Sequence, residues 1–251
     1  MIDGLVSIIT PCYNADRFVA QTIESVQRQT YPNWEMLVVD DGSVDRSADI
    51  VARYAASDGR IRLIRQKNAG TACARNAAMR VAQGRYIALL DADDIWEPTF
   101  LEAQLGFMRE CGAVCVCSGY RRIDEQSNEI LRPTVPMPVI TPRDMRVMNR
   151  IGCLTGLYDS RKHGKVMLHE EFKSIRDDYA YWYDIVALEG KACGNPQILA
   201  RYRVLSGSTT GNKLKLVVKQ YRFYRSYLRE SVAAALLNTV RWGLSGIRKF
   251  S

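Results

Sequence analysis

The stretch that decides the fold is Arg85–Asp94, RYIALLDADD, an apolar run that ends in Asp91, Asp93 and Asp94. The run predicts a buried strand, and strand alternation points Asp91 and Asp93 the same way. Unpaired carboxylates beside a core strand are costly. Hard oxygen ligands suit Mg²⁺ or Mn²⁺, which usually bring phosphate oxygens with them. The pattern favours a cation and phosphate site, and a solvated acidic turn before the helix opened by Pro98 is the alternative.

The N-terminal part alternates predicted strands and helices. Strand-like runs lie at 5–10, 36–39, 61–64 and 86–90, and helix-like segments at 18–26, 46–56 and 71–82. Repeated βα units predict a mostly parallel sheet with helices on both faces. Ligands of such sheets lie beyond the carboxyl ends of the strands. We therefore expect the polar loops around Tyr13, Asp41 and Asp91 to meet at one edge.

The pattern changes after about Phe107. We expect strands within 113–118, 149–159 and 197–204, a Pro-rich connection at 132–142, and a helix over 177–188.

Charge and cysteine content restrict the class of protein. The net charge of +8 belongs to residues 213–251, which hold nine Lys or Arg and one acid, whereas 26 basic and 26 acidic residues balance in the rest. Seven scattered cysteines and two histidines, without a CxxC pair, argue against a zinc site. Free thiols without a signal peptide predict a cytoplasmic protein. No apolar run reaches the roughly 18 residues of a transmembrane helix.

Four segments in this order and spacing resemble the family 2 glycosyltransferases, especially bacterial surface-polysaccharide enzymes of the teichuronic-acid type. They are VSIITPCYNADRF (6–18), SVQRQTYPNWEMLVVDDGSVDRS (25–47), NAGTACARNAAMRVAQGRYIALLDADDIWEP (68–98) and RDDYAYW (176–182). The resemblance implies the α/β GT-A fold, a Rossmann-like, mostly parallel sheet flanked by helices. Residues 1–212 would form this domain, with a nucleotide-sugar-binding half at 1–110 and an acceptor half at 111–212, and residues 213–251 a basic helical tail.

The resemblance also assigns donor-site roles. Pro11 and Tyr13 would line the base pocket, with Tyr13 stacked on the nucleobase, and Asp41 would accept a hydrogen bond from a uracil N–H. Arg75 and Asn76 would lie near the donor. A core aromatic at Tyr13, a turn or cap at Asp41 and a surface ion pair at Arg75 are the structural alternatives.

The DxD element would hold the donor diphosphate with Mn²⁺ or Mg²⁺. In the resemblance Asp91 points toward the ribose and Asp93 binds the metal, while Asp94 extends the metal site or caps the next helix. Relatives often read YRxH where this chain has Leu205, so no histidine is available there. Three nearby polar residues could contact phosphate or simply form a turn: Ser206, Ser208 and Thr209.

On the acceptor side, Asp178 matches the family's catalytic base. Its neighbour Asp177 replaces the usual glutamate, so either carboxylate could be the base. Tyr179 and Trp182 would flank an acceptor sugar ring, and a core position is the alternative for Trp182.

The family implies an inverting transfer from a nucleotide-sugar, with UDP favoured by the pattern around Asp41, to a saccharide or polyprenyl-linked acceptor. A nucleotidyltransferase would carry a Gly-rich phosphate loop after the first strand, and none is present. A basic nucleic-acid-binding protein would leave the acidic cluster unexplained, so we expect no nucleic-acid partner. A non-catalytic sugar-binding protein is a further alternative.

The tail predicts a basic amphipathic helix, because apolar residues recur at helical spacing from Val217 to Leu236 with Lys and Arg between them. Such a helix suits the anionic inner face of the plasma membrane, where each basic residue contributes about 1 kcal/mol. The alternative is that Tyr221, Tyr224 and Leu228 pack on the enzyme core.

Overall fold

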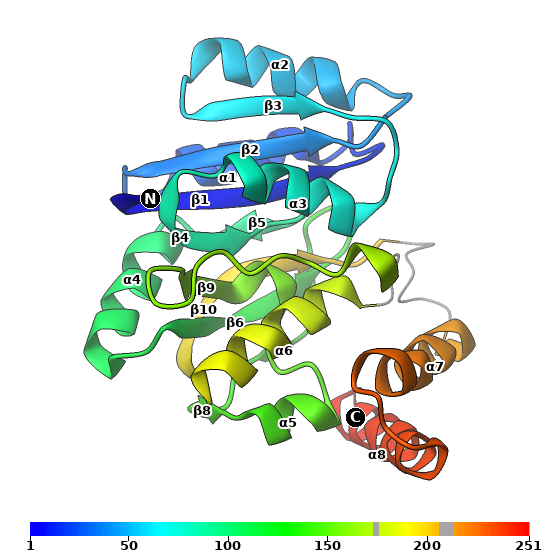
Figure 1. Cartoon of the computed structure of the whole chain (residues 1–251). Coiled ribbons are helices and arrows are strands. Elements are labelled where there is room, and N and C mark those ends of the chain that lie inside the picture. The colour runs from blue at the N-terminus through cyan, green and yellow to red at the C-terminus, as the bar shows by residue number, and fades with distance from the viewer. Residues whose placement is uncertain (173–175, 206–212, 251) are drawn as a thin grey trace.

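The computed structural model describes residues 1–172, 176–205 and 213–250, and its centre is one twisted sheet (Figure 1). The strand order is β3-β2-β1-β4-β9-β6-β10-β5, with β7 beside β6 and β8 beside β10. The strands are β1 Ile2–Cys12, β2 Trp34–Asp40, β3 Ile61–Arg65, β4 Gly84–Leu89, β5 Ile95–Trp96, β6 Cys115–Ile123, β7 Glu129–Thr134, β8 Val139–Ile140, β9 Gly156–Asp159 and β10 Ala192–Arg203.

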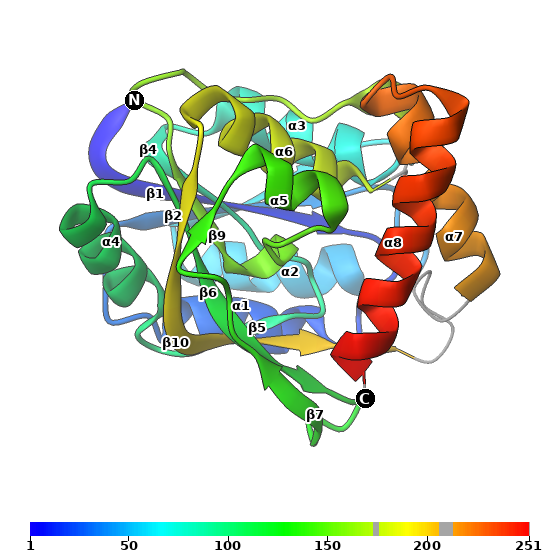
Figure 2. The same cartoon turned by 90° about the horizontal axis from the view of Figure 1, so that it is seen from below.

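Helices cover both faces of the sheet because its central strands are apolar on both sides. In β2, Val38 belongs to one core cluster and its neighbour Val39 to the other. Helices α1, α2 and α4 pack on the first face, and α3, α5 and α6 on the second (Figure 2). The helices are α1 Val19–Gln27, α2 Ser47–Ser57, α3 Thr71–Val81, α4 Phe100–Cys111, α5 Pro142–Val147, α6 Asp177–Glu189, α7 Lys213–Arg222 and α8 Val232–Phe250, with short 3-10 helices at Cys153–Thr155 and Glu170–Phe172.

The parallel βα arrangement expected for the N-terminal part is confirmed for β1 to β4. Beyond β4 the sheet is mixed, because β9 lies antiparallel between β4 and β6. The strand expected within 149–159 is only β9, preceded by a 3-10 turn, and the Pro-rich 132–142 contains the end of β7, all of β8 and the start of α5. The sheet runs through both expected halves, and the proposed division at residue 110 stays a prediction.

The single tail helix expected from Val217 to Leu236 is wrong. Helix α7 passes into a π turn at Phe223–Tyr227, and the chain then reverses into α8. The turn lets Phe223 and Tyr224 both become buried in the core cluster beneath α6. A straight helix would point consecutive side chains about 100° apart. The alternative of packing on the enzyme core therefore holds for this segment.

Within the described residues, none of the helices combines the length and apolar character needed to cross a membrane.

Candidate active site

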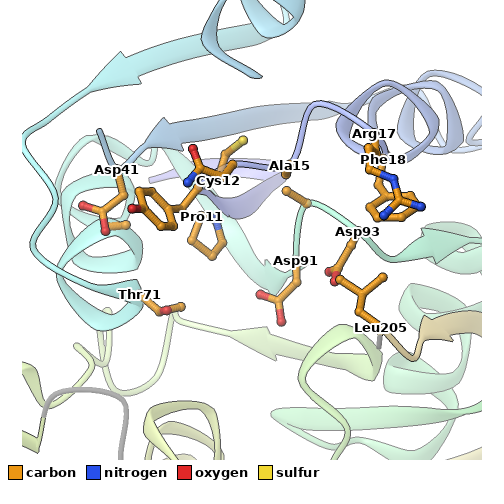
Figure 3. A pocket seen from close by; sticks show the side chains of 14 residues that line it. Pro11, Cys12, Ala15, Arg17, Phe18, Asp41, Thr71, Asp91, Asp93 and Leu205 are labelled. Atoms are coloured by element: carbon orange, nitrogen blue, oxygen red, sulfur yellow. The ribbon is translucent and has the colours of Figure 1, made fainter. Parts of the chain in front are cut away.

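A pocket of about 500 Å³ opens at the carboxyl edge of the parallel strands. Tyr13 follows β1, Asp41 follows β2, and Asp91 and Asp93 follow β4, and all four line the pocket. Figure 3 shows Asp41 and Pro11 at one end, Leu205 and Asp93 at the other, and Asp91 between them. The expected meeting of three polar loops is confirmed, because parallel strands bring their carboxyl ends to one edge.

The Asp41 end has the features of a nucleobase pocket. Asp41 Oδ1 accepts hydrogen bonds from Gln66 Nε2 at 2.7 Å and the Ala69 amide at 2.9 Å, and Oδ2 accepts one from the Gly70 amide at 2.9 Å. These bonds fix the carboxylate and tie two loops together. Because each carboxylate oxygen can accept two hydrogen bonds, Oδ2 can take one more from a ligand. Tyr13 beside it is 53% exposed and open to stacking.

The opposite end carries crowded negative charge. Burial, and next the charge of Asp91, raise the pKa of Asp93 to about 6. A divalent cation would relieve this repulsion, so the pair suits one. Across the described residues, no three Asp, Glu, His or Cys side chains form a complete metal site, so diphosphate and water would supply the other ligands. Leu205 lines this end and offers no ligand. Ser206, Ser208 and Thr209 lie outside the described residues.

Asp94 does not reach the pocket. Its side chain is buried, and Oδ1 accepts the Arg203 amide of β10 at 2.9 Å, while Oδ2 is buried without a partner. Burial, and next the charge of Asp93, raise its pKa well above the usual range. The expected roles in metal binding and in helix capping are therefore wrong for this structure, in which Asp94 holds the end of β10.

Arg203 is a site residue that sequence reasoning missed. Its guanidinium is buried and donates to the Asp93 carbonyl at 2.9 Å, to Gln21 Oε1 at 2.7 Å, and to the Asp124 carbonyl and Ser127 Oγ at 3.0 Å. It therefore fixes the loop that carries the DxD element. The match to YRxH includes Arg203, but nothing local in the sequence names these partners.

Arg75 joins the pocket to a second cavity. Its side chain is 3% exposed, and it donates to Asp91 Oδ1 at 2.5 Å, Asp177 Oδ2 at 2.9 Å and Cys153 Sγ at 3.2 Å. The expectation that Arg75 lies beside the donor site is consistent with this placement. The surface ion pair considered for it is wrong, because the side chain is buried.

The second cavity, here called the catalytic cavity, has a volume of about 360 Å³ and shares Asp91 with the first pocket. Both acids at the start of α6 line it. Asp177 is paired with Arg75, whereas Asp178 accepts a long hydrogen bond, 3.3 Å, from Asn149 Nδ2. Burial, and next the charge of Asp177, raise the pKa of Asp178 to about 6. Different surroundings thus separate the chemistry of two adjacent carboxylates.

Asn76 lies away from the donor pocket. Its side-chain amide both donates to and accepts from the Leu168 backbone, at 2.9 and 2.8 Å, and donates to Glu170 Oε1 at 2.8 Å. Asn76 does not line the donor pocket, and its hydrogen bonds instead fix the loop that precedes α6.

Tyr179 and Trp182 are core residues. Both side chains are fully buried. Tyr179 stacks on Phe223 with ring centroids 4.2 Å apart and donates its hydroxyl proton to the Met145 carbonyl. Trp182 packs so closely on Gly156 that a Cβ there would lie 2.3 Å from the indole ring. Neither ring can receive an acceptor sugar in this structure, so the expected acceptor roles do not hold.

The fold is shared with proteins of known structure. A crystal structure of S. aureus TarS 1-349 in complex with UDP-GlcNAc matches with a TM-score of 0.71 at 18% identity, covering 94% of this chain and 71% of that one. The mannosyltransferase PcManGT from Pyrobaculum calidifontis, in complex with GDP-Man and Mn²⁺, matches with a TM-score of 0.67 at 18% identity, covering 95% and 73%.

Sequence relatives extend over nearly the whole chain. TuaG of Bacillus subtilis (strain 168), a glycosyltransferase named for teichuronic acid biosynthesis, is 35% identical over 98% of this chain and 97% of its own length. The Escherichia coli protein WfgD, a UDP-Glc:alpha-D-GlcNAc-diphosphoundecaprenol beta-1,3-glucosyltransferase, is 34% identical over 99% and 96%. The family model Glycosyl transferase family 2 matches residues 7–179. The chain therefore belongs to glycosyltransferase family 2.

Proposed function

We propose that this glycosyltransferase moves a sugar from a UDP-sugar to a saccharide carried on a polyprenyl diphosphate during bacterial surface-polysaccharide synthesis. The observation that carries the proposal is the junction of two cavities, one ending at Asp41 and the other at Asp178, with Asp91 in both. The names of WfgD and of the TarS complex support a UDP-sugar donor, and that of WfgD supports a lipid-linked acceptor. Family membership favours this proposal over the nucleotidyltransferase and nucleic-acid-binding alternatives.

We assign Asp178 as the base of an inverting displacement. Asp178 removes the proton of an acceptor hydroxyl while that oxygen attacks the anomeric carbon, and the nucleoside diphosphate leaves from the opposite face. A pKa of about 6 leaves Asp178 mostly ionised at neutral pH, yet more basic than an ordinary aspartate. Asp177 is the weaker candidate, because its carboxylate is held in an ion pair with the buried Arg75 and is less free to approach an acceptor hydroxyl.

Asp93, with Asp91 beside it, would hold Mn²⁺ or Mg²⁺ together with the donor diphosphate. Such an ion, when bound, supplies Lewis-acid stabilisation of charge on the departing diphosphate. Arg203 contributes by fixing the backbone of Asp93. Because Leu205 replaces the histidine of many relatives, we expect metal retention to depend strongly on Asp93.

Calorimetric titration of UDP, with and without Mn²⁺, tests the donor assignment. We expect metal-dependent binding to the wild type that weakens at least about tenfold, 1.4 kcal/mol, in Asp93→Ala. Asp49→Ala is the matched control, since Asp49 is an exposed acid on α2. Tighter binding of GDP than of UDP would contradict the assigned nucleobase.

We also propose that the C-terminal helices lie on an anionic membrane surface, which would place the enzyme at the inner face of the plasma membrane. On α8, Val232, Leu236, Leu237 and Val240 are each more than half exposed. The exposed arginines that accompany them are Arg222, Arg225, Arg229 and Arg241. Apolar and basic side chains side by side are typical of helices that lie in the membrane interface.

A further inference from the structure

A third cavity of about 240 Å³, here called the side cavity, adjoins the catalytic cavity. The two share Tyr120, Asn149 and Gly152 in their walls. Asn149 also donates to Asp178, the assigned base. The two cavities therefore adjoin at Asn149, and a ligand whose reacting hydroxyl is at Asp178 can extend toward the side cavity.

Two arginines with unsatisfied hydrogen-bonding capacity line these two cavities. Arg150 lines the side cavity and Arg176 the catalytic cavity, and the charges of both act on the Tyr179 hydroxyl. The Nε atom of each is buried without a hydrogen-bond partner. Arg150 interacts electrostatically with the acid Asp144, and Arg176 with the acid Asp178.

Neither acid neutralises its arginine. In the part of the chain that the structure describes, no carboxylate lies within 4 Å of either guanidinium. Asp144 is instead engaged in the capping box of α5 with Thr141. Burial lowers the pKa of Arg176, which shows that its charge is poorly solvated. Besides its contact with the Trp242 ring, 5.1 Å from the guanidinium, Arg176 has no counter-ion among the described residues, and a poorly solvated cation of this kind is costly. An anionic ligand at this place would offset the cost.

The side cavity also has an apolar wall. Val135 and Met137, which line it, are 57% and 38% exposed, and Pro136 lies between them. Guanidinium groups bind phosphate oxygens through paired N–H donors, whereas the exposed Val135 and Met137 suit a hydrocarbon chain. The two adjoining cavities thus offer an acid and a cation in one wall, and a cation and an apolar patch in the other.

We propose that Arg150 and Arg176 bind the diphosphate of a polyprenyl-linked acceptor, whose saccharide enters the catalytic cavity and whose first prenyl unit lies on Val135, Pro136 and Met137. This inference rests on the proposed function and names the part of the site that recognises the lipid-linked end. An anionic saccharide would satisfy the charge alone, and the apolar wall favours the prenyl diphosphate.

The test is calorimetric titration of the UDP-saturated full-length protein with farnesyl diphosphate, farnesol and inorganic pyrophosphate. We expect farnesyl diphosphate to bind at least about tenfold more tightly than either of the others. Arg150→Ala and Arg176→Gln should each weaken it about tenfold, and Arg150→Lys less. Arg143→Ala on α5, an exposed arginine outside both cavities, is the control and should bind like the wild type.

Unchanged UDP affinity in the variants shows that they are folded. Farnesyl diphosphate binding no better than farnesol, or equally to Arg150→Ala, would overturn the diphosphate subsite. Pyrophosphate binding as tightly as farnesyl diphosphate would overturn the prenyl contact. Repeating the titration without UDP shows whether farnesyl diphosphate binds independently of the donor. If UDP fails to bind but farnesyl diphosphate binds, only the donor assignment is lost.

Discussion

At the scale of single residues, Asp177 and Asp178 are adjacent acids in the first turn of α6 with different surroundings. Asp177 pairs with a buried arginine, and Asp178 faces the catalytic cavity without a cationic partner within 4 Å among the described residues. The same substitution at the two positions should therefore affect different properties of the protein.

Asp177→Asn should lower stability. The change leaves the Arg75 guanidinium short of one counter-charge in a buried place, a loss of about 3–5 kcal/mol when such a pair is broken. Asp91 still faces Arg75, so we expect the lower end, about 3 kcal/mol, or roughly 6–12 °C in Tm. Thermal unfolding measures it. Asp178→Asn should not lower Tm, because burial already disfavours that charge, and an equal loss in both variants would contradict this contrast.

The pH profile should report the ionisation of Asp178. A base must be deprotonated, so its raised pKa means that activity is lost as pH falls through about 6. We expect kcat at saturating donor to fall about tenfold per pH unit below 6 and to be level above it. The pKa of Asp93 in the donor site is also raised to about 6, so protonation of Asp93 could weaken donor binding over the same pH range. Donor affinity is therefore measured in parallel. A flat kcat profile between pH 5 and 8 would contradict the assignment.

At the scale of elements, β10 fixes the DxD loop through Arg203. Arg203→Met removes several buried hydrogen bonds, each worth about 1–3 kcal/mol when an acceptor is left unsatisfied. We expect a loss of at least about 3 kcal/mol in denaturant unfolding, together with weaker UDP binding in Mn²⁺.

Arg201→Met is the control on the same strand. Its guanidinium is 39% exposed and paired with Glu97, so the loss should stay within about 1 kcal/mol. Equal losses in the two variants would show that Arg203 has no special structural role.

The sequence predicted the part of the site that follows the parallel strands, but not the part on α6. The βα units and the residues at their strand ends, Tyr13, Asp41, Asp91 and Asp93, followed from local periodicity. Tyr179 and Trp182 could not be placed, because α6 is apolar around most of its surface and its cover comes from the distant Phe223 and its neighbours.

The contacts of Arg75 and Arg203 were equally invisible to the sequence. Arg75 meets Asp177 across 102 positions, and Arg203 meets Asp93 across 110. Only the closure of the sheet brings such residues together, so no local pattern encodes the pairing.

At the scale of the whole molecule, the C-terminal helices join the enzyme core to the proposed membrane surface. Removing residues 213–251 would also uncover Tyr179, so surface substitutions are the cleaner test. The combined Leu236→Ser, Leu237→Ser and Val240→Ser variant should lose most co-sedimentation with phosphatidylglycerol vesicles, because those three apolar side chains are exposed.

Val44→Ser, at an even more exposed valine far from α8 in the chain, should sediment like the wild type. Phosphatidylcholine vesicles should retain little of any variant, because anionic lipid attracts the basic residues. Equal sedimentation of the triple variant and the wild type would remove the membrane proposal.

The most direct test of the whole account is sugar transfer by the wild type and Asp178→Asn, measured with a panel of UDP-sugars and GlcNAc-diphosphoundecaprenol. We predict that the wild type uses one of these donors and that Asp178→Asn loses about 10²–10⁴-fold in kcat with unchanged UDP affinity. Transfer retained by Asp178→Asn but lost in Asp177→Asn would move the base, and no transfer from any UDP-sugar would contradict the proposed substrates.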